Sequence, residues 1–372
     1  MYKDDLPSSN ELVSFTEYGI PIRNLWHMLL YAWNELPIKK YVEMVNVENS
    51  PTLDALLASI LVALIQQRLR IGLGRSYTNQ IQQIHGIRGR INFTESLKRH
   101  TFENGQAVCE FQPYSANVLK NQIIRSMLVR LIQTGNFGPD RLIADELRRQ
   151  LRKLARLLDE VDLIELQLDL LRREQTSVHD SDYRIMLAIC ELILQRQMPT
   201  ETTGHHSLLK IDHDVFILHN IYERFVANFY RLHLIGWTVK SQSRLSWHAK
   251  YENPYLPSMQ PDLVLQNKTS GEIIVLDTKF TAESLKENQW GKQTFDSSHL
   301  YQLYTYLNSQ NHLSEQYRKA SGILLYPAIH NKLSERVELE DHTMRIESVD
   351  LTAPWQAIEQ QLLSIVTVNY AG

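Results

Sequence analysis

The sequence predicts an α/β protein in two parts, a mixed, mostly helical part with a small β section over residues 1–200 and an α/β part over residues 201–372. Apolar side chains recur at helical spacing through most of the first part, whereas the region near residue 270 has short apolar runs typical of strands. Between the two parts, residues 197–212 combine Pro, Gly and polar side chains, which is typical of a linker.

Helical periodicity in the first part predicts helices over residues 22–35, 52–72, 117–133, 139–173 and 181–196. Residues 75–113 have a different pattern, with short apolar runs separated by glycines such as Gly86 and Gly89. This pattern predicts short strands joined by turns.

The second part begins with a predicted helix over residues 213–234. Two apolar runs follow, split by residues 267–271 (NKTSG), and they predict a β-hairpin with a five-residue loop. Beyond the hairpin we expect a helix over 297–309, a strand over 322–326 and a helix over 354–366.

Three charged residues lie in this predicted hairpin. Asp277 and Lys279 are two residues apart on a strand, so they share a face. If Gln266 faces Glu272 across the loop, Asp262 lies roughly opposite Leu276 and beside Asp277, with Cβ atoms about 5–8 Å apart. Buried charges are costly unless they are paired or bound to a metal, so this arrangement indicates a chemical role.

Composition excludes several classes of protein. A net charge of −3 rules out a general polycation, so any affinity for nucleic acid must come from a local patch. The two cysteines, Cys109 and Cys190, are far apart and predict neither a disulfide scaffold nor a metal site, which favours a reducing cytoplasm. The start of the chain lacks the pattern of a signal peptide, and no apolar run is long enough for a bilayer, so we expect a cytoplasmic protein without a membrane partner.

The order Pro261-Asp262, then Asp277-x-Lys279, resembles the PD-(D/E)xK phosphodiesterase core. The resemblance implies a restriction-endonuclease-like fold and a Mg²⁺ ion held by Asp262, Asp277 and the main-chain carbonyl of Thr278. Lys279 would orient the attacking water and stabilise developing negative charge.

Three more residues fit this superfamily. Gln302 and Tyr306 share one face of the predicted helix after the hairpin, which is similar to RecB-type members. Glu223 lies on the helix before the hairpin, where many of these nucleases have an extra acid. The alternative is structural: Asp262 and Asp277 would be turn and edge-strand residues with Lys279 paired to one of them, and Glu223 would be a solvated helix residue.

Longer segments resemble McrC, the nuclease subunit of the McrBC modification-dependent (type IV) restriction system. They are residues 21–33 (PIRNLWHMLLYAW), 86–91 (GIRGRI), 299–307 (HLYQLYTYL) and 324–327 (LLYP). The resemblance implies an endonuclease subunit that cleaves methylcytosine-containing double-stranded DNA with a hexameric AAA+ GTPase, whose GTP hydrolysis the N-terminal part stimulates. Residues 72–76 (GLGRS) lack the Gly-Lys-Ser/Thr ending of a phosphate-binding loop, so we expect no motor in this chain.

Two other functions stay open, a stand-alone RecB-like repair nuclease and a non-catalytic adaptor that only stimulates a GTPase. Retention of Asp262, Asp277 and Lys279 together argues against the adaptor. Lys250, Lys286 and Lys292 are candidate phosphate contacts near the hairpin.

Overall fold

The structure is a computed structural model that describes residues 19–34, 50–174, 181–197, 206–251, 253–281, 285–287, 293–328 and 332–367, without the side chains of 206–214 and 285–287. Contacts divide the chain into two compact units. The helical unit is Leu53–Met198, and the sheet unit joins residues 1–52 to residues 199–372. The helical unit thus ends close to the expected division at residue 200, and the first 52 residues group with the sheet unit.

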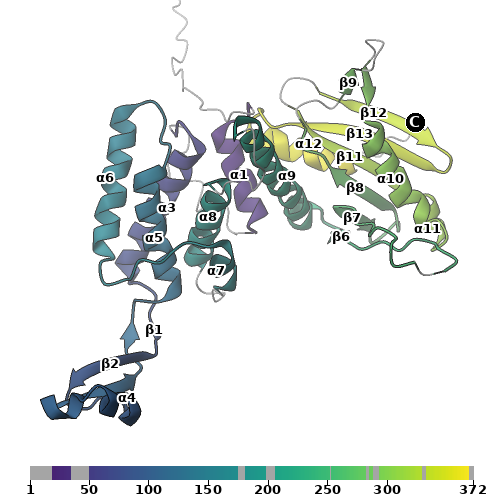
Figure 1. Ribbon diagram of the computed structural model, residues 1–372. Helices are drawn as coiled ribbons and strands as arrows, with labels where there is room; N and C mark the ends of the chain where they lie inside the picture. The colour runs from purple at the N-terminus through teal and green to yellow at the C-terminus, as the bar shows by residue number, and fades with distance from the viewer. Residues whose placement is uncertain are drawn as a thin grey trace, which may run out of the picture. The chain divides into compact units, whose positions relative to one another are not determined.

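Four long helices pack together in the helical unit (Figure 1). They are α3 (Leu53–Ile71), α5 (Leu119–Thr134), α6 (Arg141–Leu157) and α8 (Ser181–Gln197). The stretch expected as one helix over 139–173 is two helices, because α6 ends at Leu157 and the short α7 spans Leu168–Arg173. Asp140 starts α6 by accepting hydrogen bonds from the main-chain N–H groups of Leu142 and Ile143.

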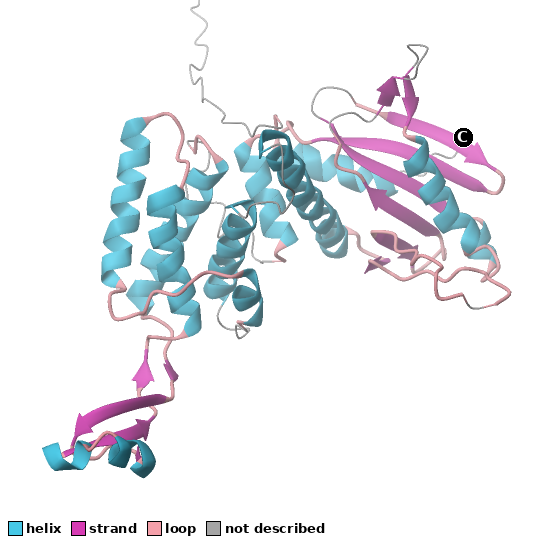
Figure 2. Ribbon diagram, viewed as in Figure 1, coloured by secondary structure: helices cyan, strands magenta, loops and turns pink. Residues whose placement is uncertain are grey.

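The small β section of this unit is present where the turn-rich sequence predicted it. An antiparallel sheet has the order β2-β4-β3, and a two-stranded ribbon of β1 and β5 lies between it and the helices (Figure 2). The strands are β1 (Ser76–Tyr77), β2 (Gln80–His85), β3 (Arg90–Ile91), β4 (Gln106–Phe111) and β5 (Tyr114–Ser115). Two short helices, α4 (Phe93–Lys98) and the 3₁₀ helix η2 (Thr101–Asn104), contact β4.

A six-stranded mixed sheet forms the centre of the sheet unit, in the order β12-β13-β11-β8-β7-β6. β8, β11 and β13 run parallel, and the remaining neighbours are antiparallel. The strands are β6 (Trp237–Ser241), β7 (Leu263–Asn267), β8 (Ile273–Thr278), β11 (Ser321–Ala328), β12 (Ser334–Leu339) and β13 (His342–Asp350). A separate hairpin consists of β9 (Leu285–Glu287) and β10 (Gln293–Phe295).

The predicted β7–β8 hairpin is confirmed, but its register differs by one residue from the expected one. Gln266 pairs with Ile273 rather than Glu272, and Leu263 pairs with Leu276. The turn takes in one more residue because the N–H of Asn267 donates to the carbonyl of Glu272 at 2.9 Å. The next position along this ladder sets Asp262 opposite Asp277 instead of Leu276.

Helix α10 (Ser297–Ser309) covers one face of the sheet (Figure 1). Leu303 and Leu307 of α10 belong to one buried cluster with Val275 and Leu324. Gly322 allows the close approach, since a Cβ atom there would lie 2.8 Å from Leu303 Cδ2. The short α11 (Glu315–Arg318) follows α10.

Helices α9 (His206–His233) and α12 (Trp355–Thr367) belong to the other face. Tyr230 of α9 donates a hydrogen bond to the carbonyl of Leu362 in α12 at 2.9 Å. The charges of Arg345 and Glu347 also act on the pKa of the Tyr230 hydroxyl. These two residues alternate along β13 with the residues that face α10, so they lie on the face of α9 and α12.

Helix α1 (Ile22–Ala32) packs against α9 within the sheet unit. The Asn24 side chain donates hydrogen bonds to the carbonyls of Leu351 at 2.8 Å and Ala353 at 2.9 Å. Tyr31 pairs with His233 Nε2 at 2.8 Å and donates to Glu359 at 3.2 Å. These polar contacts, together with the buried apolar side chains of α1, explain why α1 groups with residues far along the chain. Within the described residues, no helix has the length and apolar character needed to cross a bilayer.

Candidate active site

Strand β8 carries the most buried acid of the site. All six residues of β8 are buried, because the strand lies between β7 and β11 and is covered on both faces. Asp277 is only 2 % exposed there. An ionised carboxylate in such a place needs a partner, and the following residues supply one.

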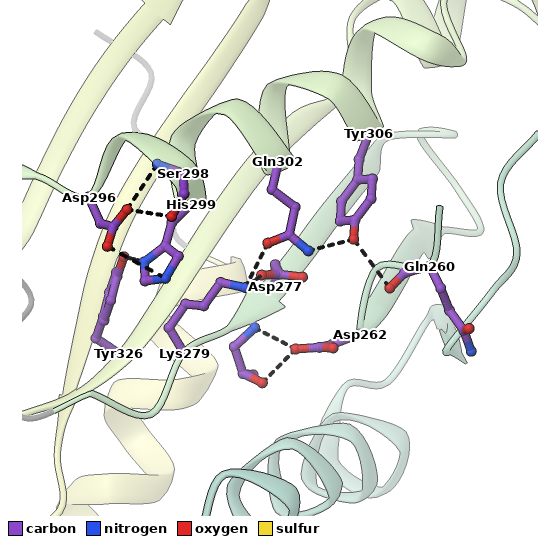
Figure 3. A network of polar contacts seen from close by, with 11 residues as sticks. Gln260, Asp262, Asp277, Lys279, Asp296, Ser298, His299, Gln302, Tyr306 and Tyr326 are labelled. Carbon is purple, nitrogen blue, oxygen red and sulfur yellow. Dashed lines mark hydrogen bonds and ion pairs between the residues drawn. The ribbon is translucent and has the colours of Figure 1, made fainter. Parts of the chain in front are cut away.

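Lys279, just beyond β8, is that partner. Its Nζ lies 2.6 Å from Asp277 Oδ2 and donates a hydrogen bond to Gln302 Oε1 at 2.8 Å (Figure 3). Gln302 in turn donates to the Tyr306 hydroxyl at 2.7 Å. The predicted pairing of Gln302 and Tyr306 on one helix face is thus present, and the chain of contacts leads directly to the lysine.

Asp262 reaches the same strand end from the start of β7. Its Oδ2 accepts hydrogen bonds from the Thr278 N–H at 2.7 Å and the Thr278 hydroxyl at 2.6 Å (Figure 3). These bonds fix the carboxylate beside the Asp277 main chain. Among the described residues, Oδ2 of Asp277 is buried and has the ion pair with Lys279 but no hydrogen-bond partner.

Burial and neighbouring charges alter the protonation of Asp277. Burial and, to a smaller extent, the nearby charge of Asp262 raise the pKa of Asp277 more than Lys279 lowers it, so that the pKa is about 6. The ion pair with Lys279 therefore stabilises the ionised form of Asp277 against the effects of burial and of repulsion by Asp262.

Glu223 on α9 belongs to the same electrostatic group. Its pKa is raised first by burial and then by the charge of Asp262. Gln242, just after β6, donates a hydrogen bond to Glu223 Oε1 at 2.8 Å. The structure thus places Glu223 near the predicted site, in a partly buried position rather than as a fully solvated helix residue.

Several neighbours of the site were not predicted as functional. The Gln260 carbonyl lies 3.5 Å from the Tyr306 hydroxyl. The nearby His219 acts to lower the pKa of both Asp277 and Glu223. Spacing of four residues on one helix could have pointed from Glu223 back to His219. No local signal in the sequence distinguishes Gln242, because its contact depends on the approach of α9 and β6.

A second polar group lies at the start of α10. Asp296 caps the helix by accepting from the Ser298 N–H at 2.9 Å, and His299 Nδ1 lies 2.8 Å from the Tyr326 hydroxyl (Figure 3). Burial raises the pKa of Tyr326, and the charges of Asp296 and Asp277 add to this. These contacts fix α10 against β11, next to Lys279.

The donor set is compatible with magnesium. Two carboxylates and the main-chain oxygen of Thr278 are hard ligands, and Mg²⁺ is commonly held by one or two carboxylates with waters completing its shell. In the part of the chain that the structure describes, there is no cluster of three or more His, Cys, Asp or Glu side chains suited to a metal. Asp262 and Asp277 would supply the side-chain ligands.

The lysines expected as phosphate contacts are less informative. Lys250 is exposed and lies 5.8 Å from the centre of the Tyr251 ring. The Lys286 side chain and Lys292 are outside the described residues.

Comparison with known proteins gives consistent results. The sequence model of the family described as "McrBC 5-methylcytosine restriction system component" matches residues 7–327. The chain is 26 % identical over 350 residues, 93 % of its length and 97 % of the relative's, to the type IV methyl-directed restriction enzyme EcoKMcrBC of Escherichia coli K12.

The fold is similar to a chain in the structure of a half-complex of Thermococcus gammatolerans McrB AAA+ hexamers with bound McrC. The TM-score is 0.57 at 16 % identity, with 93 % of this chain and 76 % of the other covered. Because the family match extends over most of the sequence, this chain belongs to the family of McrBC 5-methylcytosine restriction system components.

Proposed function

We propose that this chain is the magnesium-dependent DNA endonuclease subunit of a GTP-dependent restriction complex that cleaves methylcytosine-containing DNA. The observation that carries the proposal is the convergence of Asp262, Asp277 and Lys279, with Gln302 holding the lysine. The family adds that the chain is a component of a restriction system.

Each residue has a distinct part in this reaction. Asp262 and Asp277, with the Thr278 carbonyl, would hold Mg²⁺, which would supply Lewis-acid activation of the scissile phosphate and of the attacking water. Lys279 orients the attacking water and stabilises negative charge on the phosphate. Gln302 and Tyr306 fix the lysine, and Glu223 adds negative charge beside Asp262.

The partner follows from the relatives. McrC in the Thermococcus assembly is bound to McrB AAA+ hexamers, and we extend this arrangement to the present chain. Its partners are then a hexameric AAA+ GTPase subunit and double-stranded DNA. We assign GTPase docking and stimulation to the helical unit, because all the site residues lie in the sheet unit.

The deciding experiment measures cleavage of methylated and unmethylated DNA with Mg²⁺ and GTP, by this chain with and without its AAA+ partner. Cleavage that needs the partner, GTP and methylated DNA is the expected result. Cleavage by the isolated chain, unaffected by GTP, would instead identify a stand-alone nuclease. Absence of cleavage with intact GTPase stimulation would leave only the adaptor function.

Substitution separates the two activities. Asp277→Ala or Lys279→Ala should abolish cleavage and leave stimulation of the partner's GTP hydrolysis intact. Loss of both activities in a folded variant would contradict the assignment of the two activities to different units. Tyr301→Phe is a suitable control, because Tyr301 lies on α10 but is 70 % exposed.

A further inference from the structure

A cavity of about 480 Å³ lies in the sheet unit, over β6 and β7 and beside the end of α10. Lys240, Arg244 and His312 are its basic residues, and no acidic side chain lines it among the described residues. Within the same part of the chain, neither Lys240 nor Arg244 forms an ion pair. Two uncompensated cations in a concave, acid-free site favour an anionic ligand.

Helix α10 links the cavity to the proposed active site. Gln302 and Tyr306 lie on α10, and Gln310 caps its C-terminus. The three are spaced four residues apart and so follow one face, with about 6 Å of axial rise between successive members. Gln302 contacts Lys279 at one end of this row, and Gln310 lines the cavity at the other.

The sheet register gives a second link. Lys240 pairs with Val264, and Asp262 is two residues from Val264 along the same chain. Diagonal neighbours of this kind have Cα atoms roughly 7–8 Å apart in an antiparallel pair. Lys240 is therefore close enough to Asp262 to contact a phosphate that adjoins the scissile phosphate.

Hydrogen bonds hold the backbone on both sides of Arg244 in place. The N–H of Gln242 donates to the Asp262 carbonyl at 2.8 Å, and that of Leu245 donates to the Met259 carbonyl at 2.8 Å. Gln310, which is buried, also donates to the Ser246 carbonyl at 3.0 Å. The backbone on both sides of Arg244 is thus fixed to the strand that carries Asp262.

We propose that Lys240 and Arg244 bind a backbone phosphate of the DNA that adjoins the scissile phosphate. This inference rests on the proposed nuclease function and adds to it a positioning site that is separate from the metal ligands. Such a contact carries no sequence information, and it sets the register of the strand in the active site.

The first test measures binding of a fluorescein-labelled DNA duplex to the full chain in EDTA, over a range of salt concentrations. Each phosphate contact contributes about 0.9 to the slope of log affinity against log salt concentration. Lys240→Gln with Arg244→Gln should weaken binding at low salt and reduce this slope by about 1–2. Lys240→Arg should restore the slope that Lys240→Gln loses.

Lys268→Gln is the matched control. Lys268 is an exposed residue in the β7–β8 turn, at the opposite end of the hairpin from Asp262, and it lines no part of the cavity. The same change of charge there should leave the slope unaltered. An equal loss with Lys268→Gln would overturn the proposal, as would an unchanged slope in the double variant or no measurable binding by the unsubstituted chain.

Polyglutamate provides the competing ligand. If the double variant loses affinity for polyglutamate but keeps its affinity for DNA, the cavity accepts an acidic protein segment and the proposal is wrong.

The assembled complex supplies a separate readout. The double variant should raise the DNA concentration that gives half-maximal cleavage and keep the maximal rate. If Asp277→Ala abolishes cleavage while the double variant changes neither slope nor half-saturation, only the phosphate site is wrong. Continued cleavage by Asp277→Ala would overturn the nuclease assignment, and the metal-free slope would still decide the phosphate site.

Discussion

The ammonium group of Lys279 lies 2.6 Å from Oδ2 of Asp277, in a site where Asp277 has almost no contact with solvent. Charges removed from water are stable there only as a pair, and removing one member leaves the other without compensation. The pair therefore links the proposed chemistry of the site to the stability of the sheet unit. All six tryptophans of the chain lie in this unit, so tryptophan fluorescence reports its unfolding alone.

We expect Lys279→Met to lower the free energy of unfolding of the sheet unit by about 3 kcal/mol, because Asp277 stays buried without a partner. The double change Asp277→Asn with Lys279→Met should recover most of this loss, since neither charge remains. Urea denaturation followed by tryptophan fluorescence, without divalent metal, measures both. A double variant that is less stable than Lys279→Met would contradict this account of the pair.

The stability of the sheet unit should also depend on pH through Asp277. Burial and the charge of Asp262, partly offset by Lys279, raise the pKa of Asp277 from its usual 3.8 to about 6, so between these values the folded chain binds more protons than the unfolded chain. The contribution of Asp277 to stability is thus fully present below about pH 4 and is lost as the pH rises through 6. The loss is at most on the order of 3 kcal/mol, from about 1.4 kcal/mol per pH unit.

The measurement is urea denaturation at several pH values between 4 and 7 in EDTA, with Asp277→Asn as the reference. The unsubstituted chain should lose stability relative to this variant as the pH rises. A difference that stays constant, or that grows in favour of the unsubstituted chain, would show that the pKa of Asp277 is not raised.

The hydrogen bonds on α10 predict a graded effect on cleavage. Gln302→Leu removes the acceptor that holds Lys279 Nζ, so we expect a fall in cleavage rate of roughly 10- to 100-fold, as for loss of a hydrogen bond to a charged group. Tyr306→Phe removes only the partner of Gln302 and should lower the cleavage rate a few-fold. Both rates are measured with the full complex, with Tyr301→Phe as the control. Equal effects of Gln302→Leu and Tyr306→Phe would contradict the order of contacts.

Helix α1 should stabilise the sheet unit. Asn24→Ala leaves the buried carbonyl of Leu351 and the partly buried carbonyl of Ala353 without their side-chain donor, at a cost of about 1–3 kcal/mol. The loss should appear as a lower urea midpoint of tryptophan fluorescence. Asn308→Ala, at an exposed position of α10, is the control and should change the midpoint little. An unchanged midpoint for Asn24→Ala would mean that α1 does not belong to this unit.

Much of the site was predictable because its signals are local. Two apolar runs split by a polar turn predicted the β7–β8 hairpin, and two-residue spacing put Asp277 and Lys279 on one face. Four-residue spacing did the same for Gln302 and Tyr306 on α10. The roles given to these residues in catalysis and metal binding remain predictions.

The hairpin register was not predictable in the same way. It depends on the hydrogen bond between Asn267 and Glu272, which adds one residue to the turn. Loops of five and six residues fit the composition of this segment equally well, so the sequence pattern alone does not choose between them.

By itself, the sequence determined which segments become helices and strands and which charges share a face, because these properties repeat over a few residues. Tertiary structure decided which distant segments meet. It brought α1 into the sheet unit, Gln242 to Glu223, and Lys240 to the strand that carries Asp262. Such contacts depend on how whole elements pack, and no short stretch of sequence records that packing.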